Sequence, residues 1–175
     1  MAWTFSGDSS EDLIQAEKDV QARVGNEPID FAAMGVISNV YRVASAMRNH
    51  MEREVLAPYD LSFTAFVILF VLWIWGDSES YMVAARAGIT KGTLTGVVKT
   101  LEKQELCTRI PHDSDKRRVI VGLTSNGQAT IEKIFPLYNR EETRLVQNLE
   151  EQEKLSMGHS LRTVLRTATD IKHHK

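Results

Sequence analysis

The chain holds little of what an enzyme, a metalloprotein or a secreted protein usually needs. Its single cysteine, Cys107, rules out an intramolecular disulfide. Its five histidines are scattered and never stand at the H-x-x-x-H or E-x-x-H spacing of metal ligands. Neither a G-x-S-x-G turn nor a Gly-rich phosphate loop occurs in the sequence. We therefore expect no enzyme activity, no catalytic residues, no bound metal and no cofactor.

Long hydrophobic runs are also missing. The longest, FVILFVLWIW at residues 66–75, has about half the length that a bilayer requires. Residues 1–26 are acidic and lack the apolar segment of a secretion signal. We expect a cytoplasmic protein with no membrane partner, in which the apolar run forms a buried helix that begins near Ser62, packs on all sides and ends at Gly76.

Charge is distributed unevenly along the chain. The net charge of −2 and the pI near 6.2 argue against a basic protein that coats nucleic acid in general. Residues 1–30 hold seven acidic and two basic side chains, whereas residues 77–124 hold eight basic and six acidic ones. A locally positive module on an acidic body is typical of a sequence-specific nucleic-acid binder.

Residues 81–103, YMVAARAGITKGTLTGVVKTLEK, have the spacing of a helix-turn-helix. Ala84 is small enough for two helices to touch, Gly88 suits a turn with positive φ, and Leu94 returns an apolar side chain to the first helix. Thr90 is a good N-cap for the second helix. Four apolar residues at helical spacing form its predicted core face: Leu94, Val97, Val98 and Leu101.

The opposite face of this second helix is small, hydroxylic or basic, so it can approach a major-groove floor closely. Gly92 and Gly96 supply the small positions. The predicted DNA contacts on this face are Lys91, Thr93, Thr95 and Lys99. An ordinary helical hairpin is the alternative, since Ala-Gly spacing alone is common.

A charged hairpin follows directly. Cys107–Ile110 is a short β-compatible run, residues 111–114 contain turn residues, and Val119, Val121 and Leu123 alternate as a half-buried strand should. A hairpin that projects guanidinium groups from its tip can enter a nucleic-acid groove. The predicted DNA contacts of this hairpin are Arg109, His112, Asp115, Lys116, Arg117 and Arg118. A solvated loop of mixed charge is the alternative, but the helix-turn-helix upstream favours DNA.

In the order of these motifs, the chain resembles the winged-helix regulators of the MarR family. The pattern R-x-P-x-x-x-D-x-R-x-x-x-x-x-L-T carries the resemblance. It is matched at Arg109, Pro111, Asp115, Arg117, Leu123 and Thr124; Leu101 and Glu102 of the preceding LEKQEL also match, and Gly127 follows as in the family's L-T-x-x-G. The resemblance implies a mainly α fold with a small β wing, a winged helix-turn-helix plus terminal dimerisation helices. Glu105 departs from the family's usual Gly, so the recognition helix loses its favoured left-handed C-cap residue.

Amphipathic helices flank the winged module. One is predicted from Pro28 to Leu56; a second starts at Thr124 or Ser125 and bends near Pro136; a last one opens near Asn148. A 175-residue chain has little else to cover them, so we expect a homodimer, as the resemblance also implies. The expected domains are an acidic extension at 1–27, a dimerisation helix at 28–57, a DNA-binding domain at 58–124 and dimerisation helices at 125–175.

The resemblance further implies that a small anionic aromatic compound binds near the winged module and changes the spacing of the recognition helices. Arg42 is suited to a carboxylate, and aromatic side chains are suited to an apolar wall. The predicted effector contacts are Ser38, Tyr41, Arg42, His50, Phe66, Phe70 and Trp73. The three residues from the apolar run are alternatively plain core, and Arg42 alternatively pairs with an interface acid.

Peroxide-sensing members of the family carry a reactive cysteine in the long N-terminal helix. This chain has no cysteine in that region, so thiol sensing is disfavoured. Cys107 is expected to be a small buried hydrophobe. The sequence thus predicts a repressor that binds a pseudo-palindromic double-stranded DNA operator and is released by an aromatic acid or its thioester. A winged-helix module used only for protein contacts is the alternative; it predicts an uncharged wing and a bulky recognition face.

Overall fold

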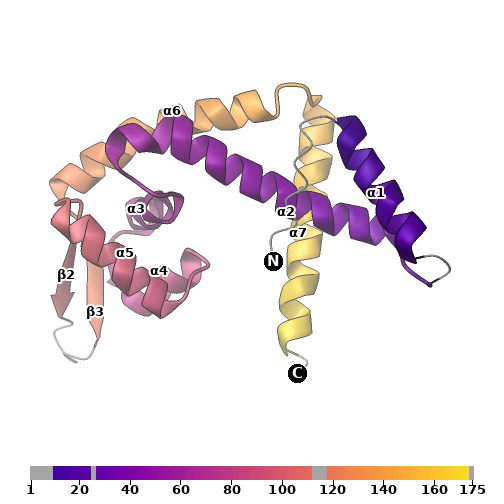
Figure 1. The fold of residues 1–175 in the computed structure, drawn as a ribbon. Coiled ribbons are helices and arrows are strands. Elements are labelled where there is room, and N and C mark those ends of the chain that lie inside the picture. The colour runs from indigo at the N-terminus through magenta and orange to yellow at the C-terminus, as the bar shows by residue number, and fades with distance from the viewer. Residues whose placement is uncertain (1–9, 25–26, 112–117, 174–175) are drawn as a thin grey trace. The chain divides into compact units, whose positions relative to one another are not determined.

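The computed structural model describes residues 10–24, 27–111 and 118–173 of the chain (Figure 1). The chain folds into two compact units, Met1–Phe63 and Thr64–Lys175. The first unit holds long helices, and the second holds the helix-turn-helix, a small sheet and the C-terminal helices. The mainly α fold with a small β wing is therefore confirmed.

Two α-helices, α1 (Ser10–Val24) and α2 (Phe31–Met51), make up most of the first unit. The second begins three residues later than predicted, because Asp30 and not a residue near Pro28 caps it. The Asp30 carboxylate accepts a hydrogen bond from the Ala33 N–H at 2.9 Å.

The long helix does not end abruptly. It continues as a π-helical turn, η1 (Glu52–Leu56), and a 3-10 turn, η2 (Ala57–Tyr59). The Glu52 carboxylate accepts a hydrogen bond from the Phe63 N–H at 2.7 Å. Since Phe63 opens the next helix, this acid satisfies one of the amides that a helix start leaves without an intrahelical partner.

The second unit is a winged helix-turn-helix followed by two long helices. Its elements are α3 (Phe63–Trp75), β1 (Ser78–Glu79), α4 (Ser80–Arg86), α5 (Lys91–Lys103), β2 (Cys107–Pro111), β3 (Val119–Leu123), α6 (Ser125–Leu145) and α7 (Glu151–His173). The three strands are antiparallel in the order β1-β3-β2, with Arg109 opposite Val121 and Ser78 opposite Val121 on the other side. The two wing strands lie side by side in Figure 1.

The core of the second unit contains most of the apolar side chains that the sequence predicts, but Val97, predicted on the core face of α5, is only half-buried. The most deeply buried side chains of this core are Ile68, Leu69, Leu72, Val83, Leu94, Val98, Leu101, Val121, Ile131 and Ile134. The apolar run in α3 is not buried on all sides, however. Val67, Phe70 and Trp73 are only half-buried, and the last turn exposes Ile74 and Trp75, so the prediction that the run packs on all sides is wrong.

The joint between α5 and β2 has left-handed backbone even though the residue there is not glycine. Glu105 has a φ of 58°. The Leu106 N–H donates to the Leu101 carbonyl at 2.9 Å, and the Glu105 N–H donates to the Glu102 carbonyl at 3.0 Å. This is the bonding of a left-handed helix cap, so the loss of glycine has not changed the geometry of the joint.

The start of α6 packs against the same joint. Thr124 is its N-cap and accepts from the Gly127 N–H at 2.9 Å, while the Thr124 hydroxyl donates to the Glu105 carbonyl at 2.6 Å. A Cβ on Gly127 would overlap the Leu106 carbonyl oxygen. The glycine is therefore required by close approach of two backbone segments.

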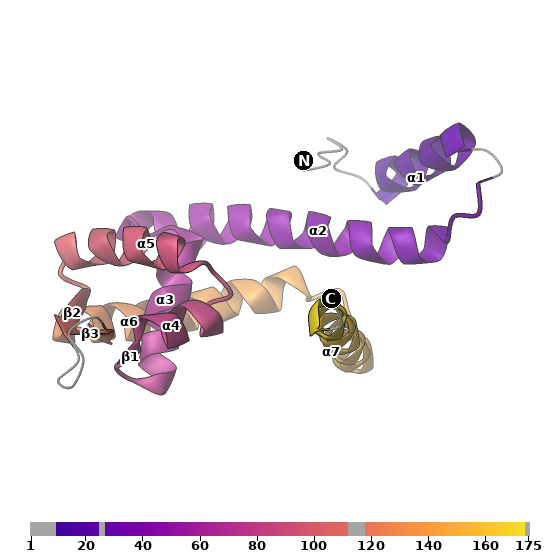
Figure 2. The ribbon, with the colours of Figure 1, turned by 90° about the horizontal axis from the view of Figure 1, so that it is seen from below.

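The C-terminal helices α6 and α7 are drawn in orange and yellow in Figures 1 and 2. Their burial agrees with the predicted pattern in part. Ile131, Ile134 and Tyr138 are buried, but Leu145 is exposed and Leu149 lies beyond the end of α6. Pro136 lies inside α6, which continues through it to Leu145. The last helix starts at Glu151, slightly after the predicted opening near Asn148.

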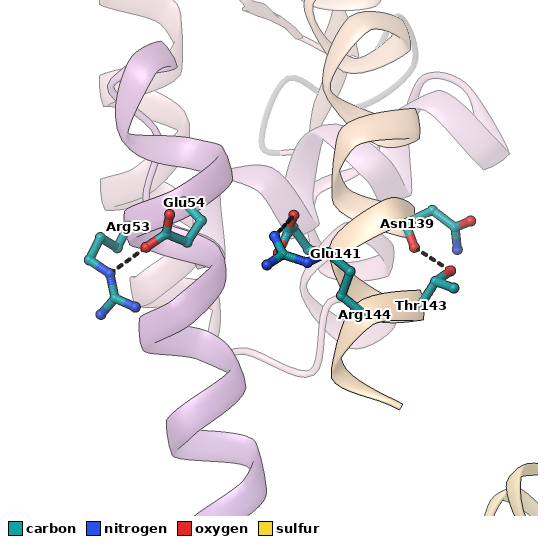
Figure 3. Close-up of polar contacts among 6 residues, drawn as sticks. All are labelled: Arg53, Glu54, Asn139, Glu141, Thr143 and Arg144. Atoms are coloured by element: carbon teal, nitrogen blue, oxygen red, sulfur yellow. Dashed lines mark hydrogen bonds and ion pairs between the residues drawn. The ribbon is translucent and has the colours of Figure 1, made fainter. Parts of the chain in front are cut away.

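Polar contacts on η1 and on α6 join residues that are close in sequence (Figure 3). Arg53 pairs with Glu54 at 2.6 Å, Arg144 pairs with Glu141 at 2.8 Å, and Thr143 donates to the Asn139 carbonyl at 3.0 Å. Exposed pairs of this kind contribute about 0–1 kcal/mol each. These contacts lie within single helical turns and do not define a site.

We predict that Glu105→Gly stabilises the protein, because a left-handed conformation costs a residue with a Cβ about 1–2 kcal/mol. The greater freedom of glycine in the unfolded chain offsets part of this, which leaves a gain of about 0.5–1 kcal/mol in chemical denaturation. Glu105→Ala is the matched control, since alanine keeps the strain. Equal stability of the Gly and Ala variants would contradict the prediction.

Candidate nucleic-acid interface

The turn between α4 and α5 has the geometry that the sequence predicts. Gly88 has a φ of 66°, and the Ile89 N–H donates to the Ala84 carbonyl at 3.0 Å. Thr90 caps α5 by accepting from the Thr93 N–H at 3.1 Å. Leu94 and Val98, each 1% exposed, then anchor α5 to the core.

This anchoring turns a polar face outward. Lys91, Thr93, Thr95 and Lys99 are all exposed, as are the intervening Gly92 and Gly96. The hydroxyl of Thr95 donates to the Lys91 carbonyl at 2.9 Å, so its oxygen lone pairs and its methyl group remain for an external partner. The face can therefore offer two ammonium groups, hydroxyl oxygens and close backbone approach to the same ligand.

The wing strands carry two of the predicted basic contacts. Arg109 on β2 pairs with Glu102 on α5 at 2.5 Å, which joins the wing to the recognition helix. Arg118, just before β3, pairs through two nitrogens with the Glu79 carboxylate of β1, with Nε at 2.6 Å from Oε2. His112, Asp115, Lys116 and Arg117 lie outside the residues that the structure describes.

Sequence reasoning missed β1 and therefore missed the partner of Arg118. A strand of two residues has no periodicity to detect, and Ser78-Glu79 follows directly on an apolar helix. The Ser80 hydroxyl adds a further bond to this region by donating to the Val119 carbonyl at 2.9 Å. Gly122 was also missed: a Cβ there would overlap the Asp77 carboxylate.

Cys107 is buried in the first wing strand, as predicted. Burial raises the pKa of its thiol to about 12, and the negative charge of Glu102 adds to the rise. Since the thiolate is the reactive form, this cysteine is chemically inert near neutral pH.

Four predicted effector contacts lie in the first unit. Tyr41 is 74% exposed, and Ser38 and His50 are half-buried. The Arg42 side chain is 19% exposed; its Nη1 lies 3.9 Å from the Glu17 carboxylate of α1 and donates to the Asn39 side chain at 3.3 Å. The acid beside Arg42 is thus Glu17 of the same chain, whereas the alternative for Arg42 expected an acid at an interface.

The other three lie in the second unit, within a cluster of aromatic rings. Phe66 is buried and stacks on Tyr138 at 4.3 Å between ring centroids. Phe70 and Trp73 are half-buried and both contact Phe135, at 5.5 and 5.3 Å. Phe66 is thus core, whereas Phe70 and Trp73 keep part of their surface for other contacts.

Tyr138 adds a polar group to this cluster. Burial raises the pKa of its phenol to about 12, with a smaller contribution from Glu142, so the hydroxyl stays protonated and can donate a hydrogen bond.

Within the described residues, no three His, Cys, Asp or Glu side chains gather in a way that would hold a metal ion. In the same part of the chain, no single helix is long and apolar enough to cross a membrane. The pair Phe31–Tyr59 and Phe63–Trp75 reaches that length and composition only when taken together across a bend.

Comparison with known proteins points to one family. The MarR family model matches residues 61–119. The chain is 36% identical over 155 residues to YwaE of Bacillus subtilis, an uncharacterized HTH-type transcriptional regulator, across 87% of this chain and 91% of that relative.

Solved structures show the same fold. MepR of Staphylococcus aureus in complex with DNA superposes with a TM-score of 0.70 at 23% identity, over 75% of this chain and 97% of MepR. BpsR of Bordetella bronchiseptica, whose DNA binding is regulated by 6-hydroxynicotinic acid, superposes with a TM-score of 0.67 at 23% identity, over 73% and 97%.

The fold and the exposed polar face of α5 define a winged helix-turn-helix DNA-binding protein. The sequence comparisons identify the family within this class: the chain belongs to the MarR family of transcriptional regulators.

The two faces of α5 should respond differently to truncation. We predict that Lys99→Ala folds normally and weakens DNA binding by about 1–3 kcal/mol. Leu94→Ala should instead lower the free energy of unfolding by about 2–5 kcal/mol, because it leaves a cavity in the core. Fluorescence anisotropy on duplex DNA and chemical denaturation measure the two effects. A stability loss in Lys99→Ala with none in Leu94→Ala would show that the two faces are assigned the wrong way round.

Proposed function

We propose that this protein is a homodimeric transcriptional repressor that binds a pseudo-palindromic DNA operator and is released from it by a small aromatic or anionic effector. The observation that carries the proposal is the outward face of α5, where exposed basic and hydroxyl side chains alternate with glycine, while Leu94, Val98 and Leu101 are buried on the opposite side. A module for protein contacts alone would favour bulky apolar side chains at these positions.

Base and phosphate contacts are divided between helix and wing in this proposal. Thr93, Thr95, Lys91 and Lys99 reach the major groove, and Arg117 with Asp115 enters the adjacent minor groove. Arg109, His112 and Lys116 complete the wing set. Phosphate contacts from these basic side chains would account for most of the affinity, while α5 reads the base sequence of the DNA.

Uncovered apolar surface supports the homodimer. Along α2, Val36, Val40 and Val43 are exposed, and along α7, Leu155 is 59% exposed with Leu161 and Leu165 also open. Apolar rows on long helices are stable in water only when covered, and a second copy covers both rows at once. Residues 28–57 and 125–175 are thus the proposed dimerisation segments, and residues 58–124 the proposed DNA-binding domain.

A two-fold dimer requires an operator whose half-sites lie about one helical turn apart, ~10–10.5 base pairs centre to centre. Inserting five base pairs between the half-sites turns the second site to the opposite face of the duplex and should abolish tight binding. Inserting ten should restore most of it. Gel shift with DNA upstream of the chain's own gene measures both. Equal loss with five and with ten base pairs would contradict the helical-phase argument.

The effector contacts proposed in the first unit centre on Arg42. Its guanidinium is partly buried, and its ion pair with Glu17 is long at 3.9 Å. An aromatic carboxylate can replace that pair with two shorter, parallel hydrogen bonds. In the second unit, the half-buried Phe70 and Trp73 offer ring surface for the aromatic part of an effector. BpsR, which has the same fold, is regulated by an aromatic acid.

Glu17 and an effector carboxylate should compete for Arg42. We predict that Glu17→Gln binds aromatic acids more tightly than the wild type and that Arg42→Ala loses the response. Thermal shift with aromatic acids and their thioesters gives the affinities at Arg42, and tryptophan fluorescence separately tests whether a ligand contacts Trp73. Glu27→Gln is a control that removes an exposed acid from the same extension. Unchanged affinity in both Glu17→Gln and Arg42→Ala would remove Arg42 from the site.

Effector and operator must also affect each other equally. A coupling of ~1–3 kcal/mol would lower operator affinity roughly 5- to 150-fold, and the operator would weaken effector binding by the same factor.

A further inference from the structure

Within the described residues, the basic side chain that follows the wing loop in sequence is paired with an acid of the same chain, although it is 44% exposed. Arg118 immediately follows the wing loop and precedes β3. Its guanidinium forms a two-point pair with the Glu79 carboxylate, whose side chain is only 16% exposed. Paired geometry of this kind fixes orientation as well as distance.

Glu79 accepts this pair in place of a local interaction. It occupies the N-cap position of α4, where short side chains such as Asp or Ser usually accept from the first amides of the helix; the longer Glu79 side chain makes no such capping bond. The carboxylate is directed across the sheet, and the backbone of Glu79 pairs with Ile120 of β3 at the same time. One residue therefore holds the wing through both its backbone and its side chain.

A second bond at this place strengthens the same attachment. The Ser80 hydroxyl donates to the Val119 carbonyl at 2.9 Å, one residue beyond Arg118. The C-terminal stem of the wing is thus tied at two consecutive residues to the segment that opens the helix-turn-helix.

We propose that Glu79 and Arg118 are positioning residues that brace the wing against β1, and that Arg118 acts through this brace and is not itself a phosphate ligand. The inference rests on the proposed DNA-binding function. Its consequence is that an acid on the DNA-binding module increases affinity for a polyanion, because it fixes the direction in which the wing leaves the sheet.

The sign of one substitution separates the two roles of Arg118. If Arg118 binds phosphate, Glu79→Gln removes a competing negative charge and should leave binding unchanged or strengthen it. If the pair is a brace, Glu79→Gln should weaken binding by about tenfold, the scale of one well-made contact. Glu132→Gln is the matched control, since it removes an exposed acid from α6 without touching the wing.

A charge swap gives the rescue. The double variant Glu79→Arg with Arg118→Glu restores the pair with reversed polarity, so a brace predicts binding within about threefold of the wild type. A phosphate ligand predicts that the swap binds worse than the wild type and falls between the single variants Glu79→Arg and Arg118→Glu, because the two charge effects then simply add. The measurement is fluorescence anisotropy on duplex DNA from upstream of the chain's own gene, with melting curves to check that each variant is folded.

A measurement without DNA keeps the brace testable by itself. In free protein, amide hydrogen exchange across Val119–Leu123 should be faster in Glu79→Gln than in the wild type and should return in the swap. If the wild type binds no duplex, the proposed function fails while this exchange still tests the brace. Wild-type exchange in Glu79→Gln, or unchanged DNA binding by that variant, would overturn the inference.

Discussion

The joint at Glu105 and Leu106 is the constraint on which the winged module depends. The Leu106 N–H closes the end of the recognition helix on Leu101, and its carbonyl accepts from the Thr124 N–H at 3.1 Å. Gly127 lies against the same carbonyl so closely that no Cβ fits. The backbone of one residue therefore sets the end of α5, the end of β3 and the start of α6, and with them the angle between recognition helix and wing.

Function is built on the face of α5 that this constraint leaves outside. Leu94, Val98 and Leu101 hold the helix rigidly, because their side chains are almost completely buried. The outward positions can then be small and polar at no cost to the core. Ion pairs from the base of the wing to its neighbours, Arg109 with Glu102 and Arg118 with Glu79, extend the same rigidity to the hairpin.

Patterns with several repeats were readable in the sequence. The apolar stripe of α5, the threonine N-caps Thr90 and Thr124 and the turn at Gly88 all follow from local stereochemistry and agree with the structure. Single-residue features were not readable. The two-residue strand β1 is too short to show a periodicity. Exposure of the last turn of α3 depends on which other segments pack against it in the folded protein.

The sequence by itself determined the fold class and the face of the recognition helix, because helical periodicity and capping act over a few residues. It also determined that the turn at Gly88 needs positive φ, whereas the close approach that requires glycine at Gly127 was seen only in the structure. Only the tertiary structure decided that Glu105 adopts a left-handed backbone, since bonds from Leu101 and Thr124 outweigh the strain of its Cβ. It likewise decided the partner of Arg118, because an ion pair across 39 residues of chain exists only after β1 and β3 have paired.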